Sequence, residues 1–172
     1  MNDYKIPLVN DTISDKELFD LADWIKTIPR LTKGELNNKF ETKWSEWMGV
    51  KSSVFVNSGS SANLLMIDAL KESGRLKSNN IIVPAVSWST TVAPVIQLGL
   101  NPILCDADKD NLGLNIEHLE EILSSKQIGA VMIVHVLGVP NHMTEICELC
   151  KKYDVILLED CCESHGSEYK GS

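Results

Sequence analysis

The chain has 172 residues, of which 44% are hydrophobic and 23% are charged, and its net charge is −8. This composition predicts one ordinary folded domain with a packed core and excludes a disordered chain. The negative charge balance disfavours nucleic acid and membrane surfaces as partners. The longest apolar run, residues 130–139, contains His135 and is too short to cross a bilayer, and the first residues lack the apolar segment of a signal peptide. We therefore expect a cytoplasmic protein.

Residues 1–50 predict a helical N-terminal arm. Ser14 and Glu17 have the spacing of a capping box, and apolar residues follow at helical spacing until Pro29. A second helix is expected from about Gly34 to Met48, ended by Gly49. Residues 51–172 then form a second region.

Strands and helices alternate in this second region. A predicted helix from Ser60 carries an apolar face, and later helices are expected to end at Gly99, to begin at Asn115 and to cover Met143–Lys152. The order predicts an α/β fold, a mostly parallel sheet with helices on both faces. The apolar face of the first helix comprises Ala62, Leu65, Met66, Ala69 and Leu70, and the expected strands are Ser53–Val56, Ile81–Val83, Pro102–Cys105, Ala130–Val134 and Val155–Leu158.

A turn of small residues lies between the first predicted strand and its helix. Ser58, Gly59 and Ser60 stand where the free N–H groups of a helix N-terminus favour an anion such as phosphate. Gly59 allows close approach of a ligand to the backbone. The alternative is an ordinary capped helix, since serine is a good N-cap residue. Neither the dinucleotide-binding glycine pattern nor the P-loop pattern occurs.

Three further residues follow predicted strands: Trp88, Asp160 and Glu163. Ligands of open α/β sheets bind beyond the carboxyl ends of the strands, so a shared pocket is expected there. Alternatively, Trp88 is a half-buried core aromatic and Asp160 caps a loop. The neighbouring hydroxyl residues are expected to cap a helix rather than to contact substrate; they are Ser87, Ser89, Thr90 and Thr91.

The five cysteines do not predict a metal site. Cys147 and Cys150 lie at helical spacing with Met143 and Ile146, and no second pair follows at zinc-finger spacing. We expect both thiols to pack in the core and all cysteines to be reduced.

Six segments in the same order resemble the DegT/DnrJ/EryC1/StrS family of pyridoxal-phosphate enzymes that modify nucleotide-linked sugars. The resemblance covers essentially the whole chain and implies part of the large domain of the aspartate-aminotransferase fold (fold type I). The segments are Leu31-Thr32-x-Gly34 with Phe40-Glu41, Ser58-Gly59-Ser60-Ser61-Ala62-Asn63, Val83–Thr91, Asp106-x-Asp108, His135-x-Leu137-Gly138 and Glu159-Asp160-x-x-Glu163-x-x-Gly166.

The resemblance implies a role for each site residue. Ser58, Gly59 and Ser60 would hold the cofactor phosphate, and Trp88 would stack on the pyridine ring. Asp160 would pair with the pyridine nitrogen and keep it protonated, which is its catalytic role. Glu163 would hydrogen-bond near the ring hydroxyl. The cofactor would be pyridoxal 5′-phosphate or pyridoxamine 5′-phosphate.

The resemblance also implies a substrate and partners. Glu163, where many aminotransferases of the family have glutamine, favours the branch that removes the 3-hydroxyl of a nucleotide-linked 4-keto-6-deoxy sugar, with glutamate as amino donor. An aminotransferase that makes an amino sugar is the alternative, and a non-catalytic fragment that needs a second polypeptide is a third possibility. The complete enzyme is expected to be a homodimer in polysaccharide (O-antigen) biosynthesis. The reactive lysine or histidine and a small C-terminal domain are expected downstream of Ser172.

Overall fold

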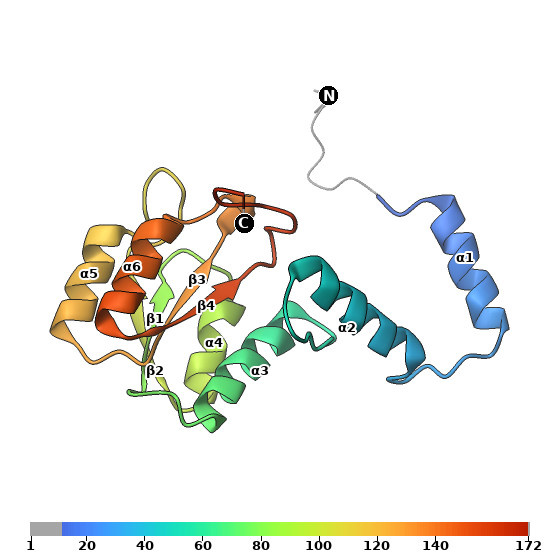
Figure 1. The fold of residues 1–172 in the computed structure, drawn as a ribbon, viewed down its shortest axis with the longest axis horizontal. Coiled ribbons are helices and arrows are strands. Elements are labelled where there is room, and N and C mark those ends of the chain that lie inside the picture. The colour runs from blue at the N-terminus through green and yellow to red at the C-terminus, as the bar shows by residue number, and fades with distance from the viewer. Residues whose placement is uncertain (1–11, 172) are drawn as a thin grey trace, which may run out of the picture. The chain divides into compact units, whose positions relative to one another are not determined.

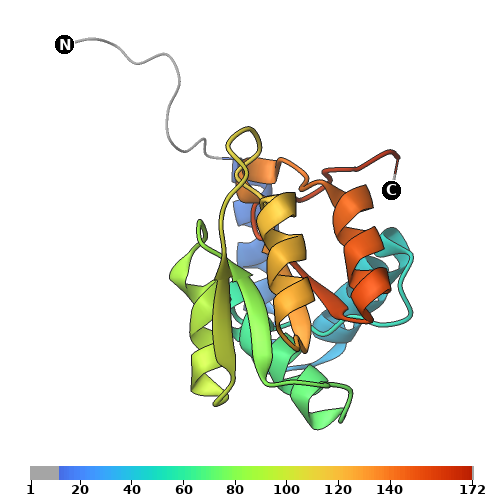
Figure 2. The same ribbon diagram turned by 90° about the vertical axis from the view of Figure 1, so that its left-hand side faces the viewer.

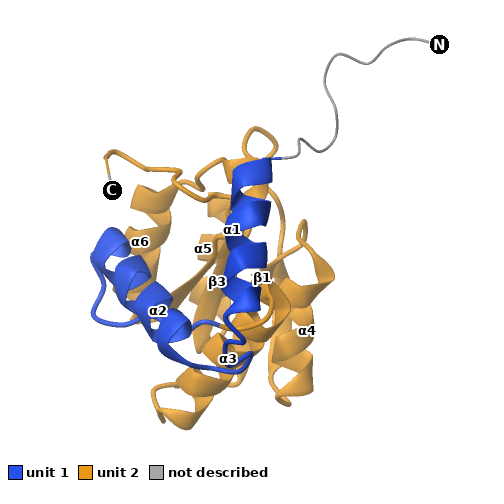
Figure 3. Ribbon diagram, turned by 90° about the vertical axis from the view of Figure 1, so that its right-hand side faces the viewer, with its two compact units in different colours: residues 1–55 blue, residues 56–172 orange. Residues whose placement is uncertain are grey.

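The computed structural model describes residues 12–171. The chain divides into two compact units, residues 1–55 and residues 56–172 (Figure 3). Each unit has its own helices, and only the second contains a sheet among the described residues. We describe the two units separately.

The first unit contains helix α1 (Asp15–Lys26) and helix α2 (Glu35–Met48). The predicted capping box is confirmed, because the Ser14 N–H donates to the Glu17 carboxylate at 2.7 Å and the Glu17 N–H donates to Ser14 Oγ at 3.4 Å. Gly49 ends α2 with a left-handed φ of 66°, the conformation in which glycine is favoured.

The strand predicted over Ser53–Val56 is wrong, since these residues form no strand in the described part of the chain. The Phe55 N–H donates to the Glu41 carboxylate at 2.9 Å, and the Phe55 ring meets Phe40 edge to face at 5.2 Å. The hydrogen bond from the Phe55 N–H lowers the pKa of Glu41, and the hydrogen bond from the Lys33 side chain adds to this effect. An apolar run supplies β-propensity, but a strand also needs a neighbouring backbone with which to pair.

The second unit is built on a parallel sheet, as the sequence predicts (Figure 1). Its four strands have the spatial order β2-β1-β3-β4, and all three neighbouring pairs are parallel. The strands are β1 (Asn80–Pro84), β2 (Asn101–Cys105), β3 (Ala130–Val134) and β4 (Ile156–Asp160).

Helices cover both faces of this sheet, which confirms the predicted architecture (Figure 2). On one face, α3 (Gly59–Glu72) and α4 (Ser89–Gln97) pack on strand residues such as Val83 and Met132. On the other face, α5 (Ile116–Ser125) and α6 (Met143–Tyr153) pack on residues such as Ile82 and Ile133. Because successive strand residues point to opposite faces, a continuous apolar strand such as β3 contributes to both cores. A short 3₁₀ turn, Val136–Gly138, follows β3.

The apolar face predicted for α3 is wrong in most positions. The helix buries Asn63, Ile67 and Leu70, whereas Leu65 is 49% exposed and Ala62 and Ala69 are also exposed. The buried asparagine explains the difference, because a hydrophobic pattern cannot assign a polar residue to the core face. The hydrogen bonds that compensate its burial lie in the site described below.

The cysteine prediction is correct for Cys150 only. Cys150, on α6, is buried in the core, and burial raises the pKa of its thiol to about 11. Cys147 is exposed, because the buried face of α6 consists of Ile146, Leu149 and Cys150. All five cysteines are free thiols. Within residues 12–171, no helix is both long and apolar enough to cross a lipid bilayer.

Candidate functional site

A buried carboxylate, Asp160, stands at the carboxyl end of β4 and is only 6% exposed. Its Oδ2 accepts hydrogen bonds from Asn63 Nδ2 at 2.8 Å and from the Thr91 hydroxyl at 3.2 Å. Its Oδ1 accepts the Cys162 N–H at 3.1 Å, so Asp160 also caps the turn that follows it. One side chain therefore ties together β4, α3 and α4.

These contacts hold Asp160 in its charged form. Burial by itself raises the pKa of the carboxyl group, but hydrogen bonds from Cys162, Asn63 and Thr91 together outweigh burial and lower it below its ordinary value of 3.8. The donors include both the N–H and the thiol of Cys162. The result is a fixed negative charge at the edge of the sheet.

The start of α3 offers donors for an anion. Ser58 is the N-cap residue: its Oγ accepts the Ser61 N–H at 3.2 Å and its carbonyl accepts the Ala62 N–H at 3.0 Å. The N–H groups of Gly59 and Ser60 precede the first intrahelical bonds and so have no partner within the helix. The capped-helix interpretation is thus correct, and it leaves two N–H groups for a ligand.

Gly59 has a second reason to be glycine. A Cβ at this position would lie 2.7 Å from Cys162 Sγ, closer than van der Waals contact allows. The turn after Asp160 therefore packs directly against the first residue of α3. This contact brings the two open N–H groups and the buried carboxylate to the same edge of the sheet.

Trp88 is the N-cap residue of α4, and its side chain is 75% exposed. The interpretation of Trp88 as a half-buried core aromatic is wrong. Trp88 precedes Thr91 by less than one helical turn, and Thr91 touches Asp160, so the indole begins from the same edge of the sheet. An exposed indole at the start of the helix that contacts Asp160 is a surface on which a planar ligand can stack.

Two of the residues that donate hydrogen bonds to Asp160 are not predicted as site residues from the sequence. Thr91 was expected to cap a helix, but it lies inside α4, is fully buried and donates to Asp160. Asn63 is only 4% exposed and was not predicted at all. The available signal is an asparagine one turn into the helix, directly between the apolar residues Ala62 and Leu64, since a buried amide requires partners.

Glu163 lies on the exposed turn after β4 and is bound to the turn after β3. Its Oε2 accepts the Leu137 N–H at 2.6 Å. Leu137 has a left-handed φ of 54°, a conformation that is unfavourable for leucine and common at functional turns. The structure records no contact between Glu163 and Asp160 among the described residues. Both lie on loops or strand ends at the carboxyl edge.

His135 forms a hydrogen-bond chain just after β3. Its Nδ1 accepts the Asn141 N–H at 3.2 Å, so the proton of the neutral ring is on Nε2, which faces the Glu159 carboxylate at 3.1 Å. With Cys161, these two residues are the one cluster in residues 12–171 whose ligand atoms lie close enough for a metal. A protonated Nε2 cannot coordinate a metal, so this arrangement favours a hydrogen-bond role.

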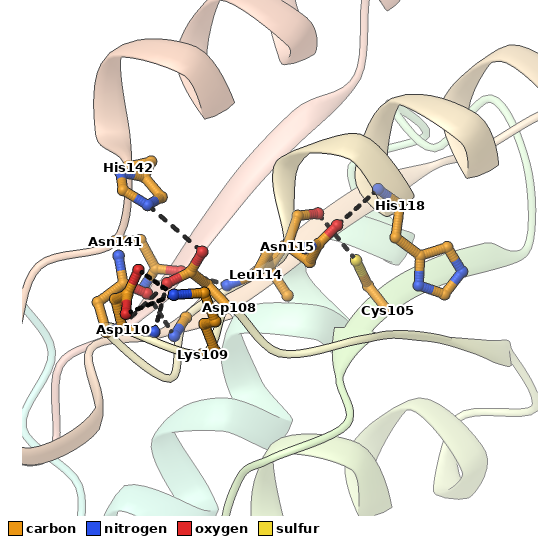
Figure 4. Close-up of polar contacts among 11 residues, drawn as sticks. Cys105, Asp108, Lys109, Asp110, Leu114, Asn115, His118, Asn141 and His142 are labelled. Carbon is orange, nitrogen blue, oxygen red and sulfur yellow. Dashed lines mark hydrogen bonds and ion pairs between the residues drawn. The ribbon is translucent and has the colours of Figure 1, made fainter.

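The acidic loop between β2 and α5 satisfies its own backbone (Figure 4). Asp108 Oδ1 accepts the N–H groups of Asp110 and Asn111 at 2.9 and 3.1 Å, and the first of these bonds is the main reason that its pKa is lowered. Asn141 Oδ1 accepts the Leu114 N–H at 2.8 Å, which fastens the loop to the turn before α6. These carboxylates therefore shape the loop.

The strand order reverses direction next to β1, near the candidate site. The chain runs from β1 to its neighbour β2 and then crosses to β3 on the other side of β1. Loops on either side of such a reversal diverge at the carboxyl ends of the strands, where open α/β sheets bind ligands. Trp88 follows β1, His135 follows β3 and Asp160 ends β4. These three residues thus stand at or after the carboxyl ends of three strands of the sheet.

The chain is similar in sequence and fold to known proteins. The chain is 39% identical over 168 residues to GDP-4-keto-6-deoxy-D-mannose 3-dehydratase of Yersinia pseudotuberculosis, covering 96% of this chain and 42% of that protein. It is 40% identical over 166 residues to the enzyme of the same name from Escherichia coli O55:H7, covering 95% and 42%. The solved E. coli GDP-4-keto-6-deoxy-D-mannose-3-dehydratase with bound hydrated PLP superposes with a TM-score of 0.84 at 38% identity, covering 96% and 43%.

The chain thus spans about 42% of the length of these curated relatives. Its α/β fold is shared with pyridoxal-phosphate-dependent enzymes of the aminotransferase-like fold. The model of the DegT/DnrJ/EryC1/StrS aminotransferase family matches residues 12–172. The chain belongs to the DegT/DnrJ/EryC1/StrS aminotransferase family.

Proposed function

We propose that this chain forms the cofactor-binding part of an enzyme that uses pyridoxal or pyridoxamine phosphate. The observation that carries the proposal is the Asp160 carboxylate, buried, charged and held by three hydrogen-bonding residues beside the open start of α3. A pyridine nitrogen retains its proton beside such an anion. When bound, the cofactor supplies an electron sink for carbanion chemistry next to the substrate carbonyl.

The residues present suit the phosphate, the ring nitrogen, the ring face and the ring hydroxyl of this cofactor. The N–H groups of Gly59 and Ser60, with the serine hydroxyl, are suited to a phosphate. Asp160 is suited to the protonated ring nitrogen, and the exposed Trp88 indole to the ring face. Glu163, held by Leu137, is assigned to the neighbourhood of the ring hydroxyl. Each of these four roles is part of the proposal.

The proposed substrate is a nucleotide-linked 4-keto-6-deoxy sugar, and the proposed reaction is loss of its 3-hydroxyl with glutamate as amino donor. The names of the two curated relatives at 39% and 40% identity support a GDP-linked sugar and a 3-dehydratase. The carboxylate of Glu163 also favours this branch. Transfer of an amino group to the sugar is the competing reaction.

Product analysis tests the reaction. A full-length enzyme that contains this chain is incubated with pyridoxal phosphate, glutamate and a GDP-linked 4-keto-6-deoxy sugar, and the sugar nucleotide is weighed by mass spectrometry. Loss of one oxygen identifies the dehydratase, whereas replacement of the keto oxygen by an amine identifies the aminotransferase. Asp160→Asn is the control and should form neither product. A sugar nucleotide left unchanged by the full-length wild type would contradict the proposal.

A cytoplasmic homodimer is the proposed state. Five free thiols, of which Cys147, Cys161 and Cys162 are exposed, suit a reducing compartment. Large apolar side chains of the first unit are exposed, including Phe19 at 69% and Trp47 at 59%, and such side chains favour association. Sedimentation equilibrium of the complete enzyme should give twice the mass of its chain. A monomer at all concentrations would contradict the dimer.

A further inference from the structure

A single amide connects three elements of the candidate site. Asn63 Nδ2 donates to Asp160 Oδ2 at 2.8 Å and to the carbonyl of Thr90 at 3.2 Å. Both partners are acceptors, so the nitrogen of the amide, and not its oxygen, must face them. Both hydrogens of the NH₂ group are therefore used, and the side chain has one orientation.

The Thr90 carbonyl is available because of Pro94. In an α-helix, the carbonyl of residue 90 would accept the N–H of residue 94, but proline has none. The buried side chain of Asn63 supplies the missing donor. Proline inside α4 and asparagine inside α3 are both unfavourable for a helix, and each compensates the other.

Asn63 also lies one helical turn after Gly59, the first residue of α3. The backbone of this turn is rigid, so the amide fixes the separation between the open N–H groups at the start of α3 and the Asp160 carboxylate. Thr91 and Cys162 contact the same carboxylate from α4 and from the following turn, but neither belongs to α3.

We propose that Asn63 is the positioning residue of this site, whose amide holds the Asp160 carboxylate in place one helical turn from the anion-binding start of α3. This inference rests on the proposed function for the identity of the ligand. It adds a residue that would act on the cofactor only through Asp160. It also assigns a purpose to Pro94, which keeps an acceptor open for the second hydrogen of the amide.

The test measures the pKa of Asp160 without any ligand, by ¹³C NMR of the chain carrying labelled aspartate. Asn63→Leu should make Asp160 about tenfold weaker as an acid, because burial is retained while a strong donor is lost. Ile67→Val is the matched control: Ile67 is fully buried one turn further along the same helix face and has no polar contact. It should leave the pKa unchanged. Should Asn63→Leu fail to fold, Asn63→Ser gives the same comparison.

A second measurement separates this inference from the proposed function. Pyridoxal phosphate is titrated into wild type, Asn63→Leu and Ile67→Val and followed by absorbance, and only Asn63→Leu should bind at least fivefold more weakly. An unchanged Asp160 pKa in folded Asn63→Leu, or an equal rise in Ile67→Val, would overturn the role of Asn63. Wild type that binds no pyridoxal phosphate while Asp160 shifts as stated would refute the cofactor and retain the positioning role.

Discussion

Gly59 and Cys162 are in such close contact that a single added carbon at position 59 would lie 2.7 Å from the thiol sulfur. The contact joins the first residue of α3 to the turn after β4, two segments distant in the sequence. Its effect is to place the helix start beside Asp160, whose carboxylate accepts hydrogen bonds from Cys162.

The first prediction concerns this contact. Gly59→Ala should destabilise the fold by about 1–3 kcal/mol, because the thiol must leave Asp160 to admit the methyl group. In a Cys162→Ala background the same change should be close to neutral, since the obstructing sulfur is gone and alanine is a good helix residue. Urea unfolding of the four proteins measures the coupling. If Gly59→Ala lowered the free energy of unfolding equally in both backgrounds, the added methyl group would not be displacing the Cys162 thiol.

The second prediction concerns the reactivity of Cys162. Its thiol is exposed, yet the hydrogen bond to Asp160, followed by burial and nearby charges, raises its pKa to about 11. Asp160→Asn should lower that pKa and accelerate alkylation by iodoacetamide near neutral pH, about tenfold for each pKa unit. Peptide mass spectrometry gives the rate, and exposed Cys147 on α6 serves as the internal standard. A constant ratio of the two rates would argue against the Asp160–thiol hydrogen bond.

The third prediction concerns Trp88. Because the indole is 75% exposed, Trp88→Ala should leave the free energy of unfolding nearly unchanged. It should weaken binding of pyridoxal phosphate by about 1–3 kcal/mol through lost stacking and burial. The control is Ile96→Ala at the far end of α4, where the side chain is 60% exposed. Identical affinities of wild type and Trp88→Ala would remove Trp88 from the site.

The fourth prediction is a pH dependence of stability. The folded-state pKa of Asp160 lies below 3.8, so its carboxylate stabilises the fold at any pH above that value. This contribution is lost as the pH falls through the folded-state pKa. The stability advantage of wild type over Asp160→Asn should therefore be constant near neutrality and shrink below about pH 4. Urea unfolding at a series of pH values measures it, and an advantage that grew on acidification would reverse the sign of the proposed shift.

Local patterns predicted much of the fold. The capping box at Ser14 and the N-cap at Asn115 are recognised from neighbouring residues alone, and both occur in the structure. The apolar run of β3 has the predicted bounds, Ala130–Val134, because a strand buried on both faces is apolar throughout. The parallel sheet and its flanking helices follow from the alternation of such runs.

The errors involve distant partners. The segment 53–56 has the composition of a strand but no adjacent strand among the described residues. Asn63 meets Asp160 across 97 positions, and no spacing rule connects them. The positions of Trp88 and Asp160 at strand ends were predictable, whereas the hydrogen bonds that hold Asp160 depend on the packing of α3 and α4.

Pro94 has a consequence for attempts to engineer this protein. A proline inside a helix is an obvious target for stabilisation, since its replacement by alanine restores a backbone donor and improves helix propensity by about 3 kcal/mol. In α4 the restored N–H would compete with Asn63 for the carbonyl of Thr90. A screen that selected only for heat resistance would favour this replacement and would at the same time release the amide that orients Asp160. Thermal robustness and a well-ordered site therefore make opposite demands on this one position.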